Sequence, residues 1–248
     1  MSSFMKTDHR PWPIPSKPWR MKQTWLNLLF AHWPIAIDKL QPFIPSPLQL
    51  DLYEGQAWIA VVPFDMSGIR LNHMPAIPFT SKFAELNVRT YVTIDNKPGV
   101  YFFSLDATNF LAVKGARAFY HLPYYLADID LHKDAQTITY HSKRSGARGD
   151  FQFHGKYKPV SPPYTTQQGT LEHWLTERYC LYTSHKGRTY RCDILHDPWP
   201  LQHAEAEIYT NTMANFNGLR LPDEKPLLHY AERLDVLTWG LEEVTPNY

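Results

Sequence analysis

The chain has 248 residues, of which 44% are hydrophobic, enough to form a sizeable buried core. Its 25 basic and 24 acidic residues leave a formal net charge of +1, which argues against nonspecific nucleic-acid binding through a basic face. Met1 to Arg10 lacks the pattern of a secretory signal, and the apolar stretch Trp25 to Ile37 is too short and too polar to span a bilayer. Because the two cysteines match no disulfide scaffold or CxxC motif, a reducing cytoplasm is the expected location.

Residues 1–20 are expected to form an extended arm, because proline fixes φ and removes a backbone donor. Four prolines lie in this arm: Pro11, Pro13, Pro15 and Pro18. Met21 to Trp33 is predicted as a helix, since its apolar residues recur at helical spacing and Pro34 follows directly. A second short helical turn is expected within Ile35 to Phe43.

Strands are predicted for most of the remaining chain. Ala57 to Met66 is apolar at nearly every position, as in a strand that is buried on both faces. Phe83 to Asp95 and Val100 to Asp106 are predicted to pair through a turn at Asn96 to Gly99. Further strands are expected at 124–131, 137–143, 151–157, 204–210 and 230–244.

Two helices and a hairpin interrupt these strands. Thr108 to His121 is predicted as a helix that ends before Pro123, and Leu171 to Arg178 as a shorter one. Tyr179 to Ile194 is predicted as a hairpin with a three-residue loop, His185 to Gly187. That register would place Ser184 opposite Arg188, Tyr182 opposite Tyr190 and Cys180 opposite Cys192, the cysteines as free thiols.

The fold class predicted from this order of elements is α+β and β-dominated, a large curved or barrel-like antiparallel sheet with a few peripheral helices. Short polar turns between adjacent strands favour antiparallel pairing over βαβ crossovers. No internal repeat, low-complexity block or clear linker divides the chain, so residues 1–248 are expected to form a single domain.

The strand at 83–94 alternates between apolar and polar residues. One face, expected to be buried, presents Ala84, Leu86, Val88, Val92 and Ile94. The other face presents Phe83, Glu85, Asn87, Arg89 and Tyr91. Successive residues on one face lie roughly 6.6 Å apart, so Glu85 and Arg89 do not pair along the strand and each needs a partner. The second face is either exposed to solvent or lines a pocket in which two aromatic rings flank acid, amide and base groups.

The elements that follow carry further charged residues. Asp106 shares a strand face with Phe102 and Ser104, and the next helix carries Lys114 and Arg117 three residues apart. Such a constellation would bind an anionic or carbonyl ligand, and Tyr120 on the same helix is a further candidate ligand-binding residue. The alternative is a set of solvated helix charges and one ion pair.

Six segments resemble the YqjF-like family of bacterial proteins. They are LLFAHWPI (28–35), AWIAVVPF (57–64), FAELNVRTYV (83–92), GVYFFSLDA (99–107), GARAFYHLPY (115–124) and WLTERYCLY (174–182). The family is grouped with the acetoacetate decarboxylase-like superfamily. The resemblance therefore implies a closed β-structure around a cavity, with the face that carries Glu85 and Arg89 turned toward that cavity.

The resemblance also suggests catalytic residues. Acetoacetate decarboxylases form a Schiff base on a lysine whose pKa an adjacent lysine lowers. The nearest candidate is Lys114, but its neighbours are Val113 and Gly115, so the adjacent lysine is absent and only Arg117 could supply a nearby positive charge. Glu85 lies at a strand position similar to that of an active-site glutamate in the acetoacetate decarboxylases. The candidate catalytic residues are Glu85 and Lys114, and the candidate ligand-binding residues are Asn87, Arg89, Tyr91, Asp106, Arg117 and Tyr120.

Other motifs are absent from the sequence. Twelve histidines include no HExxH pattern, and His196 and His203, which flank a rigid Asp-Pro-Trp-Pro turn, are expected to serve packing and hydrogen bonding. Neither a metal nor another cofactor is expected. The expected partner is a small anionic or carbonyl-containing molecule, not nucleic acid or a membrane, and a homo-oligomer is left open.

Two functions are compatible with these features. The first is an enzyme that acts on a carbonyl or carboxylate compound and differs from an authentic acetoacetate decarboxylase. The second is a non-catalytic ligand-binding or sensing protein that uses the same cavity.

Overall fold

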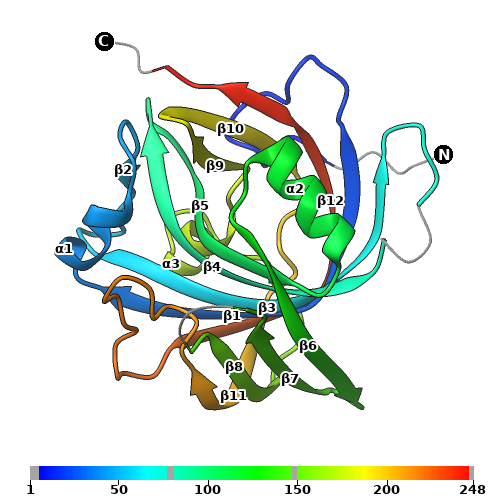
Figure 1. The fold of residues 1–248 in the computed structure, drawn as a ribbon, viewed down its shortest axis with the longest axis vertical. Coiled ribbons are helices and arrows are strands. Elements are labelled where there is room, and N and C mark those ends of the chain that lie inside the picture. Colours follow the sequence, from blue (N-terminus) through cyan, green and yellow to red (C-terminus); the bar gives the residue numbers. More distant parts are fainter. Residues whose placement is uncertain (1–5, 77–80, 147–149, 246–248) are drawn as a thin grey trace.

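The computed structural model describes residues 6–76, 81–146 and 150–245. Twelve strands belong to one sheet, accompanied by a few short helices (Figure 1). The strands are β1 (Met21–Ile35), β2 (Gln49–Leu50), β3 (Ala57–Leu71), β4 (Phe83–Ile94), β5 (Lys97–Ala107), β6 (Tyr124–Asp134), β7 (Thr137–Arg144), β8 (Gln152–Pro159), β9 (Cys180–His185), β10 (Arg188–Leu195), β11 (Gln202–Asn211) and β12 (Leu227–Glu243). The helices are α1 (Ile37–Leu40), a 3-10 turn (Gln41–Phe43), α2 (Phe110–Tyr120) and α3 (Leu171–Thr176).

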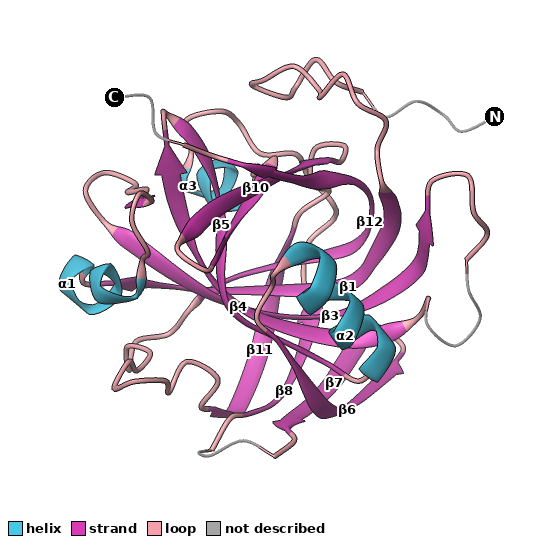
Figure 2. Ribbon diagram, turned by 45° about the horizontal axis from the view of Figure 1, so that its top comes forward, coloured by secondary structure: helices cyan, strands magenta, loops and turns pink. Residues whose placement is uncertain are grey.

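Hydrogen bonds between strands form a closed ring through nine strands, in the order β5, β6, β7, β8, β11, β12, β1, β3 and β4. A second path also joins β5 to β12, through β9 and β10. This path closes a second ring, which shares strands β1, β3 and β4 with the first. The three shared strands run through the middle of the molecule (Figure 2). These three strands are therefore covered on both faces.

Two of the strand pairs are parallel, which corrects the wholly antiparallel sheet expected from the sequence. Strand β5 pairs in parallel with both β6 and β9. The chain leaves β5, passes through α2 and returns beside β5 as β6, so this segment is a βαβ unit (Figure 1). The β-dominated class with peripheral helices is confirmed.

Each face of the three central strands packs against its own core. One core contains Ala84, Leu86 and Val88 of β4 together with Tyr140 and Phe153 from β7 and β8. The other core, on the opposite face, is built from β1, β3, β5, α2 and the start of β6. Of the twelve residues of β4, all but Thr93 are buried. The solvent-exposed interpretation of its second face is therefore wrong.

Residues 21–33 form part of strand β1, so the helix predicted there is wrong. The β1–β3 register shifts between Leu26 and Ala31, and Asn27 within this bulge has a φ of 54°. A bulge inserts residues that do not take part in the alternation. Because β1 is also buried on both faces around Phe30, its apolar residues recur at intervals that resemble a helix.

Two hairpin turns are shorter than predicted. The β4–β5 turn is Asp95 and Asn96, and the β9–β10 turn is Lys186 and Gly187, all four with positive φ. This combination is typical of two-residue turns between twisted strands. The predicted register of the second hairpin is therefore wrong by one residue.

In that hairpin, Tyr182 faces Arg191 and Cys192 faces Leu181, instead of the tyrosine and cysteine pairs expected. Both cysteines are free and buried.

The other predicted helices are confirmed within a few residues at each end. Asn109 begins α2, because its side chain accepts a hydrogen bond from the backbone nitrogen of Ala112 at 3.0 Å. His121, with a φ of 52°, ends the helix. None of the helices in the described ranges has the length and apolar character needed to cross a membrane.

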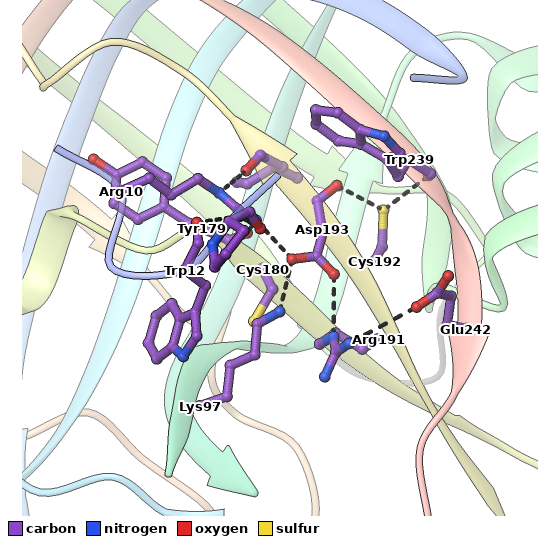
Figure 3. A network of polar contacts seen from close by, with 12 residues as sticks. Arg10, Trp12, Lys97, Tyr179, Cys180, Arg191, Cys192, Asp193, Trp239 and Glu242 are labelled. Carbon is purple, nitrogen blue, oxygen red and sulfur yellow. Dashed lines mark hydrogen bonds and ion pairs between the residues drawn. The ribbon is translucent and has the colours of Figure 1, made fainter. Parts of the chain in front are cut away.

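Residues 6–20 form no helix or strand and are attached to the sheet by Arg10. Its guanidinium, fully buried, donates to Asp193 Oδ1 at 2.6 Å, and Lys97 (2.8 Å) and Arg191 (3.1 Å) contact the same carboxylate (Figure 3). Arg10 also donates to the backbone carbonyls of Trp12, Pro13, Tyr179 and Ile194. Burial opposes ionisation of Asp193, but the three cations outweigh it and lower the pKa of its carboxyl.

We expect Arg10→Met to lower the free energy of unfolding at pH 7 by about 2–3 kcal/mol, because a buried carboxylate and several carbonyls lose a charged donor. Urea denaturation measures this change. Lys17→Met is the control, since Lys17 forms an exposed ion pair with Glu242 at 3.0 Å, and such pairs contribute at most about 1 kcal/mol. Equal effects of the two substitutions would contradict the anchoring role of Arg10.

Candidate functional site

A pocket of about 100 Å³ lies against the face of β4 that carries Glu85, Asn87 and Arg89. Its walls come from β1, β3, β5, β6, β9, β10, β12 and α2, and most of its lining is apolar. The polar lining residues are Gln23, Glu85, Asn87, Arg89, Tyr120, Tyr124, Cys192 and Thr238. The alternation of β4 places Glu85, Asn87 and Arg89 on this one face, and all three are buried.

Glu85 is a buried acid held by a hydroxyl group. The Tyr124 hydroxyl donates to Glu85 Oε2 at 2.7 Å, and Glu85 as a whole is 2% exposed. Burial raises its pKa to about 8 and the charge of Asp106 adds to this, against the hydrogen bonds from Tyr124 and Asn87. Glu85 is therefore protonated at neutral pH and gains or loses its proton slightly above it.

Arg89 is a buried cation without a carboxylate partner among the described residues. Its guanidinium carbon lies 5.2 Å from the ring centre of Phe30 and 5.9 Å from that of Tyr91. Its Nε atom and Oδ1 of Asn87 have no hydrogen-bond partner in the described part of the chain. Because a buried charge and a buried polar atom are costly without partners, this end of the pocket favours an anionic or polar ligand.

Tyr91 and Asp106, predicted to bind the ligand, are buried and do not line the pocket. The Tyr91 hydroxyl lies 2.7 Å from His32 Nε2. Asp106 accepts hydrogen bonds on both carboxylate oxygens from Arg144, at 2.8–3.1 Å. Both side chains are thus engaged by partners far away in the sequence.

Lys114 and Arg117 lie on the exposed side of α2 and not in the pocket. The Lys114 ammonium lies 4.5 Å from the ring centre of Phe110, and Arg117 Nε donates to the backbone carbonyl of Tyr124 at 2.6 Å. Ala116 and Tyr120 are the residues of α2 that face the pocket. Among its described lining residues the pocket has no lysine, so Lys114 is not positioned to act with Glu85.

A wider apolar groove of about 500 Å³ adjoins the pocket. Six residues line both: Met21, Gln23, Met66, Ala116, Tyr120 and Tyr124. The rest of the groove includes Phe83, Leu71 and two exposed side chains of α2, Leu111 and Phe119. The groove therefore joins the Glu85 pocket to the surface along one side of α2.

Tyr124 and Gln23 line the pocket and are not among the site residues predicted from the sequence. Tyr124 begins β6 and Gln23 belongs to β1, and neither is close to Glu85 along the chain. No local pattern marks them, because their position depends on the closure of the sheet.

The fold defines the class of protein. The structure resembles the enduracididine biosynthesis enzyme MppR complexed with pyruvate, with a TM-score of 0.61 and 9% identity over 92% of this chain and 91% of that one. It also resembles an acetoacetate decarboxylase from Legionella pneumophila, with a TM-score of 0.59 and 12% identity over 99% and 98% of the two chains. The chain therefore has the acetoacetate decarboxylase-like fold.

The sequence places the chain within a particular family. Residues 22–235 match the DUF2071 family, described as an uncharacterized conserved protein. The chain is also 50% identical over 230 residues to the uncharacterized protein YqjF of Bacillus subtilis (strain 168), covering 93% of this chain and 95% of that protein. The chain belongs to the DUF2071 family, and the resemblance inferred from its motifs is confirmed.

Glu85→Gln is expected to change how stability depends on pH. Below its ordinary value of 4.5 Glu85 is protonated in both the folded and the unfolded state, and above about 8 it is ionised in both. Between these limits only the unfolded state releases the proton, so the wild type loses up to about 1.4 kcal/mol per pH unit as pH rises. The variant has no carboxyl group at this position and does not lose this stability. Its free energy of unfolding, measured by urea denaturation and compared with that of wild type, should therefore rise from pH 5 to pH 8.

Glu224→Gln is the matched control, because Glu224 is exposed. Its stability relative to wild type should stay constant over the same pH range. A constant difference for Glu85→Gln as well would show that Glu85 is ionised in the folded protein at neutral pH.

Proposed function

We propose that the protein is an enzyme that binds a small carbonyl-containing carboxylate in the Glu85 pocket and transfers a proton on it. One observation carries this proposal: a buried, protonated acid and a buried cation without an acidic partner among the described residues line the same pocket. The comparison with MppR supports the ligand class, since that enzyme is described in complex with pyruvate.

The spacing of Glu85 and Arg89 suits a ligand that lies between them. Four steps along the strand separate their Cα atoms by roughly 13 Å, and Asn87 lies midway. The pocket volume of about 100 Å³ corresponds to roughly three water molecules, the size of a ligand with a few non-hydrogen atoms. Arg89 would bind the carboxylate of such a ligand and Glu85 would reach its carbonyl end.

The chemistry assigned to Glu85 is proton transfer at the carbon next to the carbonyl group. The ionised fraction of Glu85, which grows as pH rises toward 8, takes a proton from that carbon. The electron pair of the broken C–H bond moves onto the carbonyl oxygen to give an enolate. The same carboxyl group then returns a proton to carbon. A pKa of about 8 suits both steps near neutral pH.

The adjoining groove suits an apolar substituent on the ligand. It is larger than the pocket and lined mainly by apolar side chains, among them Leu71, Phe83 and Phe119. A 2-oxo acid with an aromatic or branched substituent would place its charged end at Arg89 and its substituent between α2 and β3.

Substitution of Arg89 tests the binding part of the proposal. Isothermal titration with pyruvate and with phenylpyruvate should show tighter binding of phenylpyruvate to wild type, because its ring occupies the groove. Arg89→Met should weaken binding of both at least about tenfold, since it removes a charged donor. Lys114→Met, on the exposed side of α2, should leave both affinities unchanged.

An unchanged affinity in Arg89→Met would contradict the proposal. Borohydride reduction in the presence of acetoacetate is expected to leave Lys114 unmodified, and covalent trapping there would reverse the assignment of this residue.

Proton transfer is tested separately from binding. In heavy water, NMR should show wild type exchanging the methyl protons of pyruvate for deuterium, faster as pH rises toward 8, and Glu85→Gln should bind pyruvate without this exchange. Binding without exchange in wild type would establish the alternative function, a non-catalytic ligand-binding protein. One observation favours this alternative: the described lining residues of the pocket include no lysine that could form a Schiff base.

A further inference from the structure

We propose that Glu172, His203 and His229 bind a divalent transition-metal ion, most favourably Zn²⁺, at a site distinct from the Glu85 pocket. One nitrogen of each imidazole and one carboxylate oxygen of Glu172 all lie within 4.8 Å of one another. Two histidines and one carboxylate are a ligand set that zinc accepts, with a fourth position left for water. The proposal does not depend on the function assigned to Glu85.

The fold brings these residues together from three elements. His203 of β11 and His229 of β12 are directly opposite each other in an antiparallel pair, where side chains on one face are neighbours. Their ring centres are 6.2 Å apart. Glu172, in the first turn of α3, lies with Oε1 3.1 Å from His229 Nε2.

The burial of the three residues differs in a way that suits metal entry. His229 is completely buried, Glu172 is partly buried and His203 is exposed. The exposed His203 ring, which packs against the Tyr164 ring with 5.1 Å between their centres, can be reached by an ion that arrives from solvent.

Only a small movement separates the present arrangement from a metal site. Zinc bonds to nitrogen and oxygen of roughly 2.0–2.2 Å place tetrahedral ligand atoms about 3.4 Å apart. Glu172 and His229 already meet this spacing, so rotation of the His203 side chain completes the site. The sequence predicts packing and hydrogen bonding for His203 and no metal, because the pairing of β11 with β12 is not visible in the sequence.

The structure offers a matched control for the histidine pair. His141 and His154 are also directly opposite each other, on β7 and β8, with ring centres 5.5 Å apart. No carboxylate joins them in a metal-binding cluster among the described residues. The same sheet therefore contains a second cross-strand histidine pair without a carboxylate, and this pair is the control.

The test uses the full chain without a histidine tag, freed of metal by a chelator. Wild type should bind one Zn²⁺ by isothermal titration, and Co²⁺ should give the visible absorption of a tetrahedral site. His203→Gln and Glu172→Gln should each weaken Zn²⁺ binding at least tenfold and remove the Co²⁺ absorption, while His154→Gln should change neither. Circular dichroism checks that each variant is folded, and His203, being exposed, is the safer substitution.

Three results would overturn the proposal. The first is the absence of Zn²⁺ binding to wild type, which would leave Glu172 and His229 as a hydrogen-bonded pair only. The second is equal loss of binding in His154→Gln and His203→Gln, which would indicate nonspecific binding to surface histidines. The third is unchanged binding in both His203→Gln and Glu172→Gln.

Discussion

Strand β4 is covered on both faces, and this constraint determines the environment of every polar side chain that it carries. One face packs against β7 and β8, and the other faces the core that β1, β3, β5 and α2 complete. Glu85, Asn87 and Arg89 are therefore removed from water by the topology of the sheet and not by any local arrangement. The raised pKa of Glu85 follows directly from this burial.

Other buried charges in the protein show what a purely structural role looks like. Asp193 contacts Arg10, Lys97 and Arg191, and Asp106 forms a bidentate pair with Arg144. In both cases the charge is neutralised by partners within the chain. The pocket differs, because Arg89 has no such partner among the described residues and Glu85 holds its proton instead. Groups that are costly to bury and left uncompensated are characteristic of functional sites.

The sequence predicted the residues of β4 correctly and their surroundings poorly. Alternation identified which side chains share a face, since it depends only on strand geometry. It could not show that Asp106 pairs with Arg144, or that Lys114 points away from the pocket, because both depend on how distant elements pack. The same limit explains the other errors: the bulge at Asn27 imitated helical spacing, and the left-handed conformation of Lys186 shortened the hairpin loop by one residue.

A chain of contacts leads from Arg89 in the pocket to His32. The Arg89 guanidinium carbon lies 5.9 Å from the centre of the Tyr91 ring, and the Tyr91 hydroxyl lies 2.7 Å from His32 Nε2. Burial, followed by the charge of Arg89, lowers the pKa of His32 well below its ordinary value, and a charge at His229 would lower it further, so His32 is neutral. A cation bound beside His229 would add to the same effect. Because neutral His32 adds no charge next to Arg89, the positive charge available to an anionic ligand is that of Arg89 itself.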